Sequence, residues 1–164
     1  MSLPSLDLAY ARLLVTGELL AANFYTQALA AALSGRSVTG YLRRALFNEQ
    51  EHYASVAAIL SGAGAAPAVA SDITFSYPDG TFASEAAIVR FAVQLESTLT
   101  GAYLGAISGL QTSGLAGGLA SILACEAEHC SYFRQVGGGR AFDLSFPPTL
   151  TISQASDAIS AYTE

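Results

Sequence analysis

The sequence predicts an all-α protein: a bundle of four long helices, a long crossover between the second and third, and a short fifth helix at the C-terminus. Three observations predict it. Apolar residues recur at helical spacing in four long segments, a Glu-x-x-His motif occurs twice, and a connection containing Gly, Ala and Pro separates the two halves. The chain therefore reads as two copies of one helical hairpin.

Both histidines of the chain lie in Glu-x-x-His motifs. Glu49 with His52 forms the first, and Glu126 with His129 forms the second, 77 positions later. Residues i and i+3 lie on one face of a helix, so each motif can present a carboxylate and an imidazole to one point. Two histidines placed alike in this way are poorly explained by coincidence.

A lone glutamate inside an apolar run precedes each motif, and a tyrosine follows each glutamate by seven positions. The pairs are Glu18 with Tyr25 and Glu96 with Tyr103. Seven positions are about two helical turns, so each tyrosine shares a face with its glutamate. A glutamate on an apolar face is costly unless it is paired or bound to a metal.

The first hairpin is expected to contain helices at 7–33 and 38–60, with Asp7 in the first turn and Gly35 as a stop. The short link Gly35-Arg36-Ser37 would make these helices antiparallel neighbours. Residues 61–83 then form a long connection, with Phe75, Tyr77 and Phe82 as expected anchors against the bundle. Its length suits a crossover along the whole bundle.

The second hairpin is expected at 84–110, with Ser84 and Glu85 at its start, and at 115–136, ended by three glycines. Residues 142–148 read as extended, and 152–162 as the short fifth helix. A glycine at every fourth position of the third helix indicates a close approach, either inside the bundle or between subunits. These glycines are Gly101, Gly105 and Gly109.

Length and composition favour a single domain spanning 1–164, with the bundle at about 6–137 and a C-terminal extension at 138–164. The charged fraction is 12%, lysine is absent and the net charge is −6, so nucleic acid is not an expected partner. So few charges predict a covered apolar surface and hence a homo-oligomer, with a dimer favoured.

No secretory signal opens the chain, and its longest apolar window is too interrupted to span a membrane. The expected location is cytoplasmic as written, or exported if a leader was removed. Cys125 and Cys130 lie five apart on one predicted helix, where their side chains diverge, so we expect two buried thiols rather than a disulfide or metal ligands.

Four glutamates and two histidines can supply six ligands for two cations, with two carboxylates bridging, two terminal and one histidine on each ion. The predicted metal ligands are Glu18, Glu49, His52, Glu96, Glu126 and His129. Carboxylates with imidazole suit two Fe or Mn ions, although Zn could occupy such a site in a purified sample. Open coordination positions would admit dioxygen or peroxide.

The surroundings of these donors leave alternatives open. Tyr25 and Tyr103 either hydrogen-bond to ligand carboxylates or simply pack in the core. No nearby acid is predicted to orient the histidines, so backbone carbonyls, Gln27, Gln94 or Asn23 are candidates. Without metal, four crowded carboxyl groups would share protons and raise one another's pKa values.

Residues 17–25, together with the two motifs, resemble the ferritin-like superfamily, and more closely the ferritin-like domain of desiccation-related proteins of bacteria and plants. The resemblance implies a four-helix bundle with a dinuclear site formed by the six residues above. The sparse charge argues against a storage cage, and no Cys-x-x-Cys pair offers a rubredoxin-type electron donor.

Two functions follow as hypotheses. The first is a dinuclear iron or manganese protein that reacts with dioxygen or peroxide, as an oxidase or peroxidase. The alternative is a stress-related structural or binding bundle, in which the metal site is structural or empty.

Overall fold

The computed structural model describes residues 2–31, 36–142 and 144–164. Over these ranges the chain contains α-helices, two short 3-10 helices and no β-strand, which confirms the predicted all-α class with a crossover and a short last helix. The α-helices are α1 (Ser5–Ala30), α2 (Arg36–Gly62), α3 (Glu85–Gly109), α4 (Ala116–Val136) and α5 (Ile152–Ser160).

The helix ends differ slightly from prediction. α1 starts two residues earlier than predicted, at Ser5, with Pro4 as its N-cap residue. Its predicted end and Gly35 lie outside the described residues, whereas Arg36 and Ser37, predicted as part of a link, already belong to α2. Ser84 caps α3 as predicted, because its side chain accepts a hydrogen bond from the Ala87 N–H.

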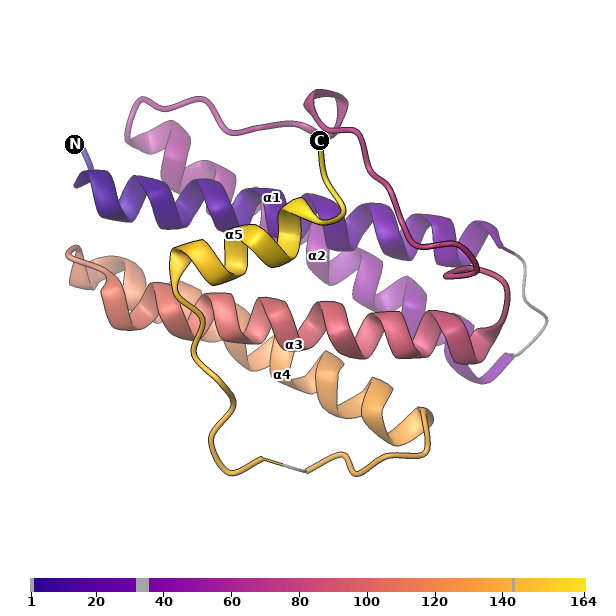
Figure 1. Ribbon diagram of the computed structural model, residues 1–164. Coiled ribbons are helices and arrows are strands. Elements are labelled where there is room, and N and C mark those ends of the chain that lie inside the picture. The colour runs from indigo at the N-terminus through magenta and orange to yellow at the C-terminus, as the bar shows by residue number, and fades with distance from the viewer. Residues whose placement is uncertain (1, 32–35, 143) are drawn as a thin grey trace.

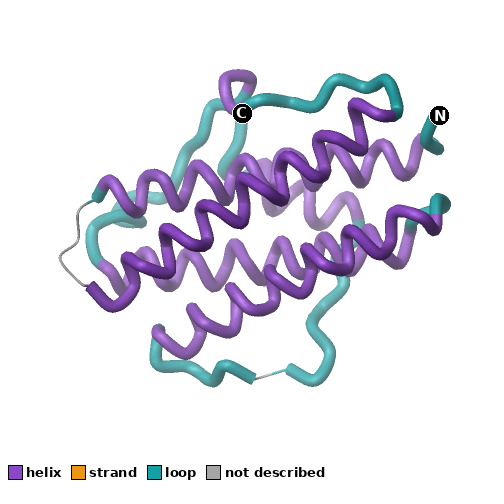
Figure 2. The backbone as a smooth tube through the Cα atoms, turned by 180° about the vertical axis from the view of Figure 1, so that it is seen from behind, coloured by secondary structure: helices purple, strands orange, loops and turns teal. Residues whose placement is uncertain are grey.

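The four long helices form two antiparallel hairpins (Figure 1). α1 packs along α2 and α3 along α4, while α1 also meets α3, and α2 meets α4. α5 lies across α1 and α3 (Figure 1), and the view from behind shows the other side of the bundle, where α2 and α4 run (Figure 2). None of the helices described is long and apolar enough to cross a membrane.

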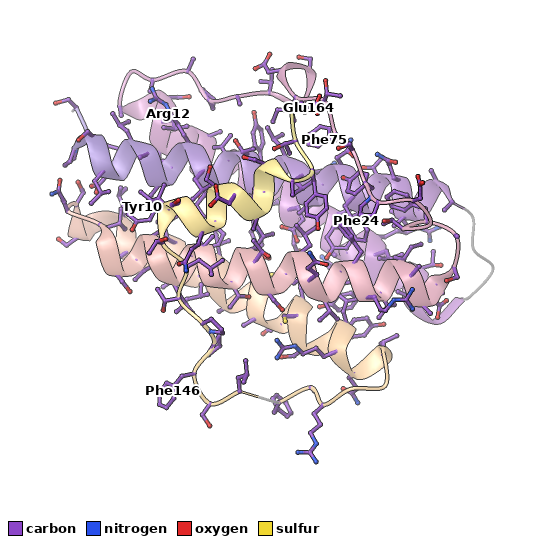
Figure 3. The ribbon with its side chains drawn as sticks, in the orientation of Figure 1. Tyr10, Arg12, Phe24, Phe75, Phe146 and Glu164 are labelled. Carbon is purple, nitrogen blue, oxygen red and sulfur yellow. The ribbon has the colours of Figure 1, made fainter. Side chains whose placement is uncertain are left out.

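Between α2 and α3 the chain runs the length of the bundle, passing through a 3-10 helix, η1 (Ala70–Asp72) (Figure 1). The predicted anchors Phe75, Tyr77 and Phe82 pack against the core. The crossover also pairs with the C-terminal segment, since Thr74 and Glu164 exchange two backbone hydrogen bonds of 2.7 and 2.9 Å. Figure 3 shows Glu164 beside the crossover at Phe75.

The glycines of α3 make their close contacts within the chain. The Leu150 N–H donates to the Gly101 carbonyl at 2.9 Å. A Cβ at Gly105 would lie 1.9 Å from the Leu150 oxygen, and one at Gly109 would meet the Tyr10 ring. The row of glycines therefore admits the segment before α5 and the side chain of Tyr10, so a close approach inside the molecule explains it.

The apolar core consists of two clusters. One surrounds Phe24, Leu99 and Phe133, and the other surrounds Leu14, Leu60 and Tyr103. Between them lies a layer of buried polar side chains contributed by all four long helices. This layer is where both halves of the repeat meet.

Candidate metal centre

The buried polar layer contains all six of the predicted metal ligands. α1 and α3 each place one glutamate in this layer, and α2 and α4 each place one Glu-x-x-His motif there, as the spacing of the repeat predicts. The four glutamates Glu18, Glu49, Glu96 and Glu126 are fully buried, while His129 is 1% and His52 9% exposed. Carboxylates and imidazoles from four helices thus share one water-excluded space.

A first group of donors surrounds the His52 imidazole. Glu18, Glu49, His52 and Glu126 each offer one atom, and these atoms all lie within 4.8 Å of one another. His52 Nδ1 is 2.8 Å from Glu126 Oε1 and 3.2 Å from Glu49 Oε2. Glu18 Oε2 is 3.7 Å from the same nitrogen.

A second group surrounds His129 and shares two carboxylates with the first. It comprises Glu49, Glu96, Glu126 and His129, again within 4.8 Å. His129 Nδ1 is 2.9 Å from Glu49 Oε1 and 3.6 Å from both Glu96 Oε1 and Glu126 Oε2. Glu49 and Glu126 therefore lie between two histidines, whereas Glu18 and Glu96 each belong to one group.

Several donor atoms in this layer have no hydrogen-bond partner. Short distances to the imidazoles do not satisfy them, because hydrogen-bond geometry is lacking. The atoms are Glu18 Oε2, Glu49 Oε1, Glu96 Oε2, both carboxylate oxygens of Glu126, and His129 Nδ1. Buried unpaired carboxylate oxygens are costly in free energy. Hard oxygen donors with one imidazole per group suit divalent transition metals, so the residues present fit a metal site.

Burial and mutual repulsion perturb the acids of the site. Burial, reinforced by the charge of Glu126, raises the pKa of Glu18 well above its ordinary value. The same causes raise the pKa of Glu96 to about 8. Burial alone would lower the pKa of His52 and His129, but their close contacts with Cys125 and with the surrounding carboxylates raise both. The metal-free layer thus favours protonated side chains.

Each tyrosine of the repeat bonds to the opposite half. The Tyr25 hydroxyl on α1 donates to Glu96 on α3, and the Tyr103 hydroxyl on α3 donates to Glu18 on α1. Both tyrosines are fully buried. These two hydrogen bonds join the hairpins across the buried layer.

The histidine surroundings correct the sequence interpretation. Asn48 Nδ2 lies 3.0 Å from His129 Nε2 and donates to Cys125 Sγ at 3.3 Å. Cys125 Sγ also lies 3.5 Å from His129 Nε2. Asn48 and Cys125 directly precede Glu49 and Glu126, so they are equivalent positions of the repeat. Their equivalent positions in the repeat were the signal in the sequence that could have identified them.

The residues proposed earlier to orient the histidines have other partners. Asn23 accepts hydrogen bonds from Gln27 and Tyr77, and Gln94 donates to the Tyr162 hydroxyl. All of these contacts lie away from the imidazoles.

The cysteines differ in their surroundings. Both are free thiols, and Cys130 is buried as expected, but Cys125 is only partly buried. Burial alone would raise the pKa of the Cys125 thiol, yet hydrogen bonds to His129 and His52 lower it. Cys125 is thus a polar neighbour of both imidazoles rather than a packed hydrophobe.

Comparison with known proteins agrees with the fold and the buried cluster. Residues 6–139 match the family model described as a ferritin-like domain. No curated protein matches the sequence. Because the match covers most of the chain, this protein belongs to the ferritin-like domain family.

Proposed function

We propose that this chain binds two iron or manganese ions and reacts with dioxygen or peroxide. The observation that carries the proposal is the presence of two donor groups, one per histidine, that share Glu49 and Glu126. In this assignment Glu49 and Glu126 would contribute to holding both ions, Glu18 and Glu96 would each contribute to one, and His52 and His129 would each hold one ion.

The protein's own residues would hold and orient the site. Tyr25 donates to Glu96 Oε1 and Tyr103 to Glu18 Oε1, and the second oxygen of each carboxylate has no hydrogen-bond partner and would be available to an ion. Asn48 and Cys125 contact the outer nitrogen of His129 and fix its ring. When bound, the two ions supply one-electron redox chemistry toward dioxygen or peroxide.

The motif resemblance extends this proposal. Gly17 to Tyr25 and the two Glu-x-x-His motifs favour the desiccation-related branch of the family, and the chain is proposed to be a single ferritin-like domain. Sparse surface charge favours a homodimer.

The test begins with metal analysis of protein purified without added metal. Fe(II) is then added in the presence of air, and the near-ultraviolet absorbance is followed. We expect two metal ions per chain and a rapid absorbance change, which Glu18→Ala and Glu96→Ala should abolish. The matched control is Glu51→Ala, an exposed position of α2, which should behave as the parent. Full reactivity in both site variants would reject the assignment.

A second function is supported by the short distances between histidines and shared glutamates. His52 Nδ1 to Glu126 and His129 Nδ1 to Glu49 measure 2.8 and 2.9 Å, so charged pairs could stabilise the layer by themselves. In that case the metal, if bound, would serve stability alone. Chelation would lower the melting temperature while peroxide turnover remained absent, whereas the first proposal requires turnover.

A further inference from the structure

A stack of two tyrosine rings connects the buried donors to the surface between α2 and α4. The rings of Tyr41 and His129 meet edge to face, with their centroids 5.9 Å apart and an interplanar angle of 84°. Tyr41 also lies flat on Tyr132, with centroids 3.5 Å apart and an angle of 8°. Both tyrosines are only partly buried. The pair therefore reaches from a candidate metal ligand to the side of the bundle where α2 and α4 run (Figure 2).

Phe133 packs against the pair and extends it inward. Its ring is T-shaped to both Tyr41 and Tyr132, with centroids 5.3 and 5.5 Å away. It also stacks on Tyr25 at 5.9 Å, and the Tyr25 hydroxyl donates to Glu96. The rings of Tyr25, Phe133 and Tyr41 thus form a second connection between the carboxylates and the surface pair.

The other half of the repeat lacks this stack. The two halves are offset by 77 positions, so Gly118 is the equivalent of Tyr41, and Ser55 is the equivalent of Tyr132. Both equivalents are exposed, and neither carries a ring that could adjoin His52. The four-helix bundle therefore forms without an aromatic pair at this place, and the stack is particular to the side of His129.

Tyrosine differs from phenylalanine because its phenol can lose one electron together with its proton. Tryptophan, which has comparable redox chemistry, does not occur in the sequence, and neither does a Cys-x-x-Cys pair for a rubredoxin-type iron centre. Reduction of dioxygen or peroxide consumes electrons. Two phenols next to a candidate ligand histidine are placed to pass these electrons inward.

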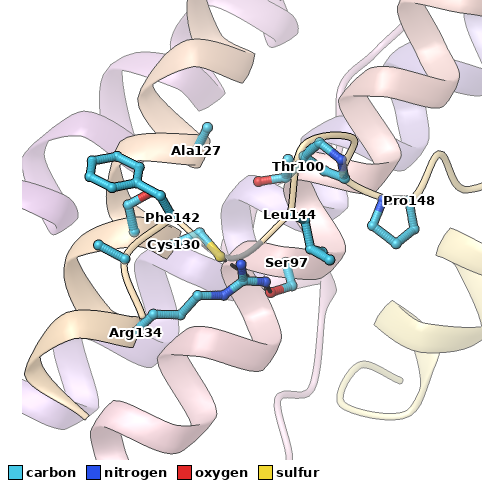
Figure 4. Close-up of a pocket in the computed structure, with 11 residues that line it drawn as sticks. Ser97, Thr100, Ala127, Cys130, Arg134, Phe142, Leu144 and Pro148 are labelled. Atoms are coloured by element: carbon cyan, nitrogen blue, oxygen red, sulfur yellow. Dashed lines mark hydrogen bonds between the residues drawn. The ribbon is translucent and has the colours of Figure 1, made fainter. Parts of the chain in front are cut away.

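Two thiols lie near the same histidine, and they face different neighbours. Cys130 faces α3: its Sγ lies 3.3 Å from Ser97 Oγ, in the wall of a cavity of about 200 Å³ (Figure 4). Cys125 Sγ lies 3.5 Å from His129 Nε2 and is only partly buried. Cys125 therefore competes with the tyrosines for oxidation, so their role has to be tested in its absence.

We propose that Tyr41 and Tyr132 are the place where electrons enter the metal centre from a small one-electron reductant at the α2–α4 surface. The inference rests on the proposed function, because it needs a centre that reduces dioxygen or peroxide. Tyr41 gives one electron to the centre and its phenolic proton to water. Tyr132 restores Tyr41 with one electron and one proton, and takes the same from the reductant. With ascorbate, two ascorbate anions and one hydrogen peroxide yield two ascorbyl radical anions and two water molecules.

The stack predicts a covalent product when no reductant is present. Carbon atoms of the two rings face each other at van der Waals distance. Two tyrosyl radicals formed there would join through the ring carbons next to their hydroxyls. Each ring loses one hydrogen, and one hydrogen peroxide becomes two water molecules. The resulting dityrosine would link α2 to α4.

The test follows dityrosine by its fluorescence and by mass spectrometry of the cross-linked peptides. Protein loaded with Fe(II) and freed of unbound metal is treated with hydrogen peroxide without a reductant. We expect the cross-link, and a tyrosyl radical in the electron paramagnetic resonance spectrum of freeze-quenched samples, in the parent and in Cys125→Ser. Tyr41→Phe and Tyr132→Phe keep a ring at each position, so each should retain metal but lose the cross-link.

Tyr162→Phe is the matched control, because Tyr162 is also partly buried and stacks on a tyrosine, Tyr77, with centroids 6.4 Å apart. This variant should form the cross-link as the parent does. Re-reduction of the peroxide-treated protein by ascorbate should slow at least about fivefold in Tyr41→Phe and change less than about twofold in Tyr162→Phe.

A metal-free reaction separates this inference from the proposed function. Oxidation by light, a ruthenium tris(bipyridyl) complex and persulfate should cross-link Tyr41 to Tyr132 in the parent, because it needs the stack alone. Peroxide consumption by the loaded parent without a cross-link, and with equal ascorbate kinetics in Tyr41→Phe, would overturn electron entry here and leave the proposed function intact. A parent that cross-links in light but consumes no peroxide would reject the proposed function and electron entry together. Equal cross-linking by peroxide in Glu49→Ala would show direct oxidation of the tyrosines and overturn the assignment.

Discussion

The α1–α2 and α3–α4 hairpins present the same donors to the centre of the bundle but differ on their outer faces. Inside, a glutamate on one helix and a Glu-x-x-His motif on the next are matched, and even the tyrosine contacts are reciprocal. Outside, Tyr53 fills one groove while Cys130 and Arg134 line a cavity in the other. The inner faces carry matching residues because both hairpins contribute to the same two donor groups. Each outer face contacts only its own covering segment, so its residues can differ.

The largest expected effect is on metal content. It distinguishes the carboxylates that belong to both donor groups from those that belong to one. Glu49→Ala removes a donor from both groups, so metal content should fall close to zero. Glu18→Ala leaves the group around His129 complete and should retain about half of the metal. Elemental analysis of both purified variants measures this. Equal metal content in the two variants would mean that the carboxylates are not divided in this way.

A pH series tests whether the two hairpins contribute equally to the buried charge. The pKa of Glu18 and of Glu96 is raised in the folded protein, the latter to about 8, so the folded state holds protons that the unfolded chain has released. Stability of metal-free protein should therefore be greatest near pH 4.5 and fall as the pH rises toward about 8.

Melting temperatures measured in EDTA between pH 4.5 and 8 follow this loss of stability. Added Mn(II) should reduce the loss, because it favours the ionised carboxylates. Glu18→Gln and Glu96→Gln should each reduce the slope. If only one of the two substitutions reduces the dependence of melting temperature on pH, the two hairpins contribute unequally to the buried charge.

Gly105 tests the close approach on the second hairpin alone. Gly105→Ala places a methyl group against the Leu150 carbonyl and should lower the free energy of unfolding by about 1–3 kcal/mol. Gly117→Ala is the control in α4, where a Cβ meets no atom within 4 Å, and it should raise stability by about 0.5–1 kcal/mol. Urea unfolding compares them, and the interpretation fails if both substitutions stabilise.

The smallest effect concerns the link between hairpins. Asp7 at the start of α1 accepts backbone hydrogen bonds from Gln111 and Thr112, just beyond α3, at 2.8 and 2.9 Å. Asp7→Asn weakens charge-assisted bonds and should cost about 1–2 kcal/mol of unfolding free energy. Asp157→Asn, at an exposed position of α5, should change stability by less than about 0.5 kcal/mol. Similar losses in both variants would remove Asp7 from this role.

The parts of the fold and site that follow from local spacing were predictable from the sequence. Glu49 and His52 must share a helix face, and a charged face inside an apolar run demands a partner, so the buried layer could be anticipated. The approach of Asn48 to His129 could not, because it joins residues of two helices. Likewise the spacing of Gly105 indicated a close neighbour, but nothing local identified Leu150 as that neighbour.

The pairing of Thr74 with Glu164 has a consequence for the order of assembly. Glu164 follows all six donors in the chain, so it is synthesised after them. The six donors all lie before residue 130 and are brought together by helices α1 to α4 alone. During synthesis, the four helices that carry the donors can therefore assemble before Glu164 pairs with the crossover at Thr74.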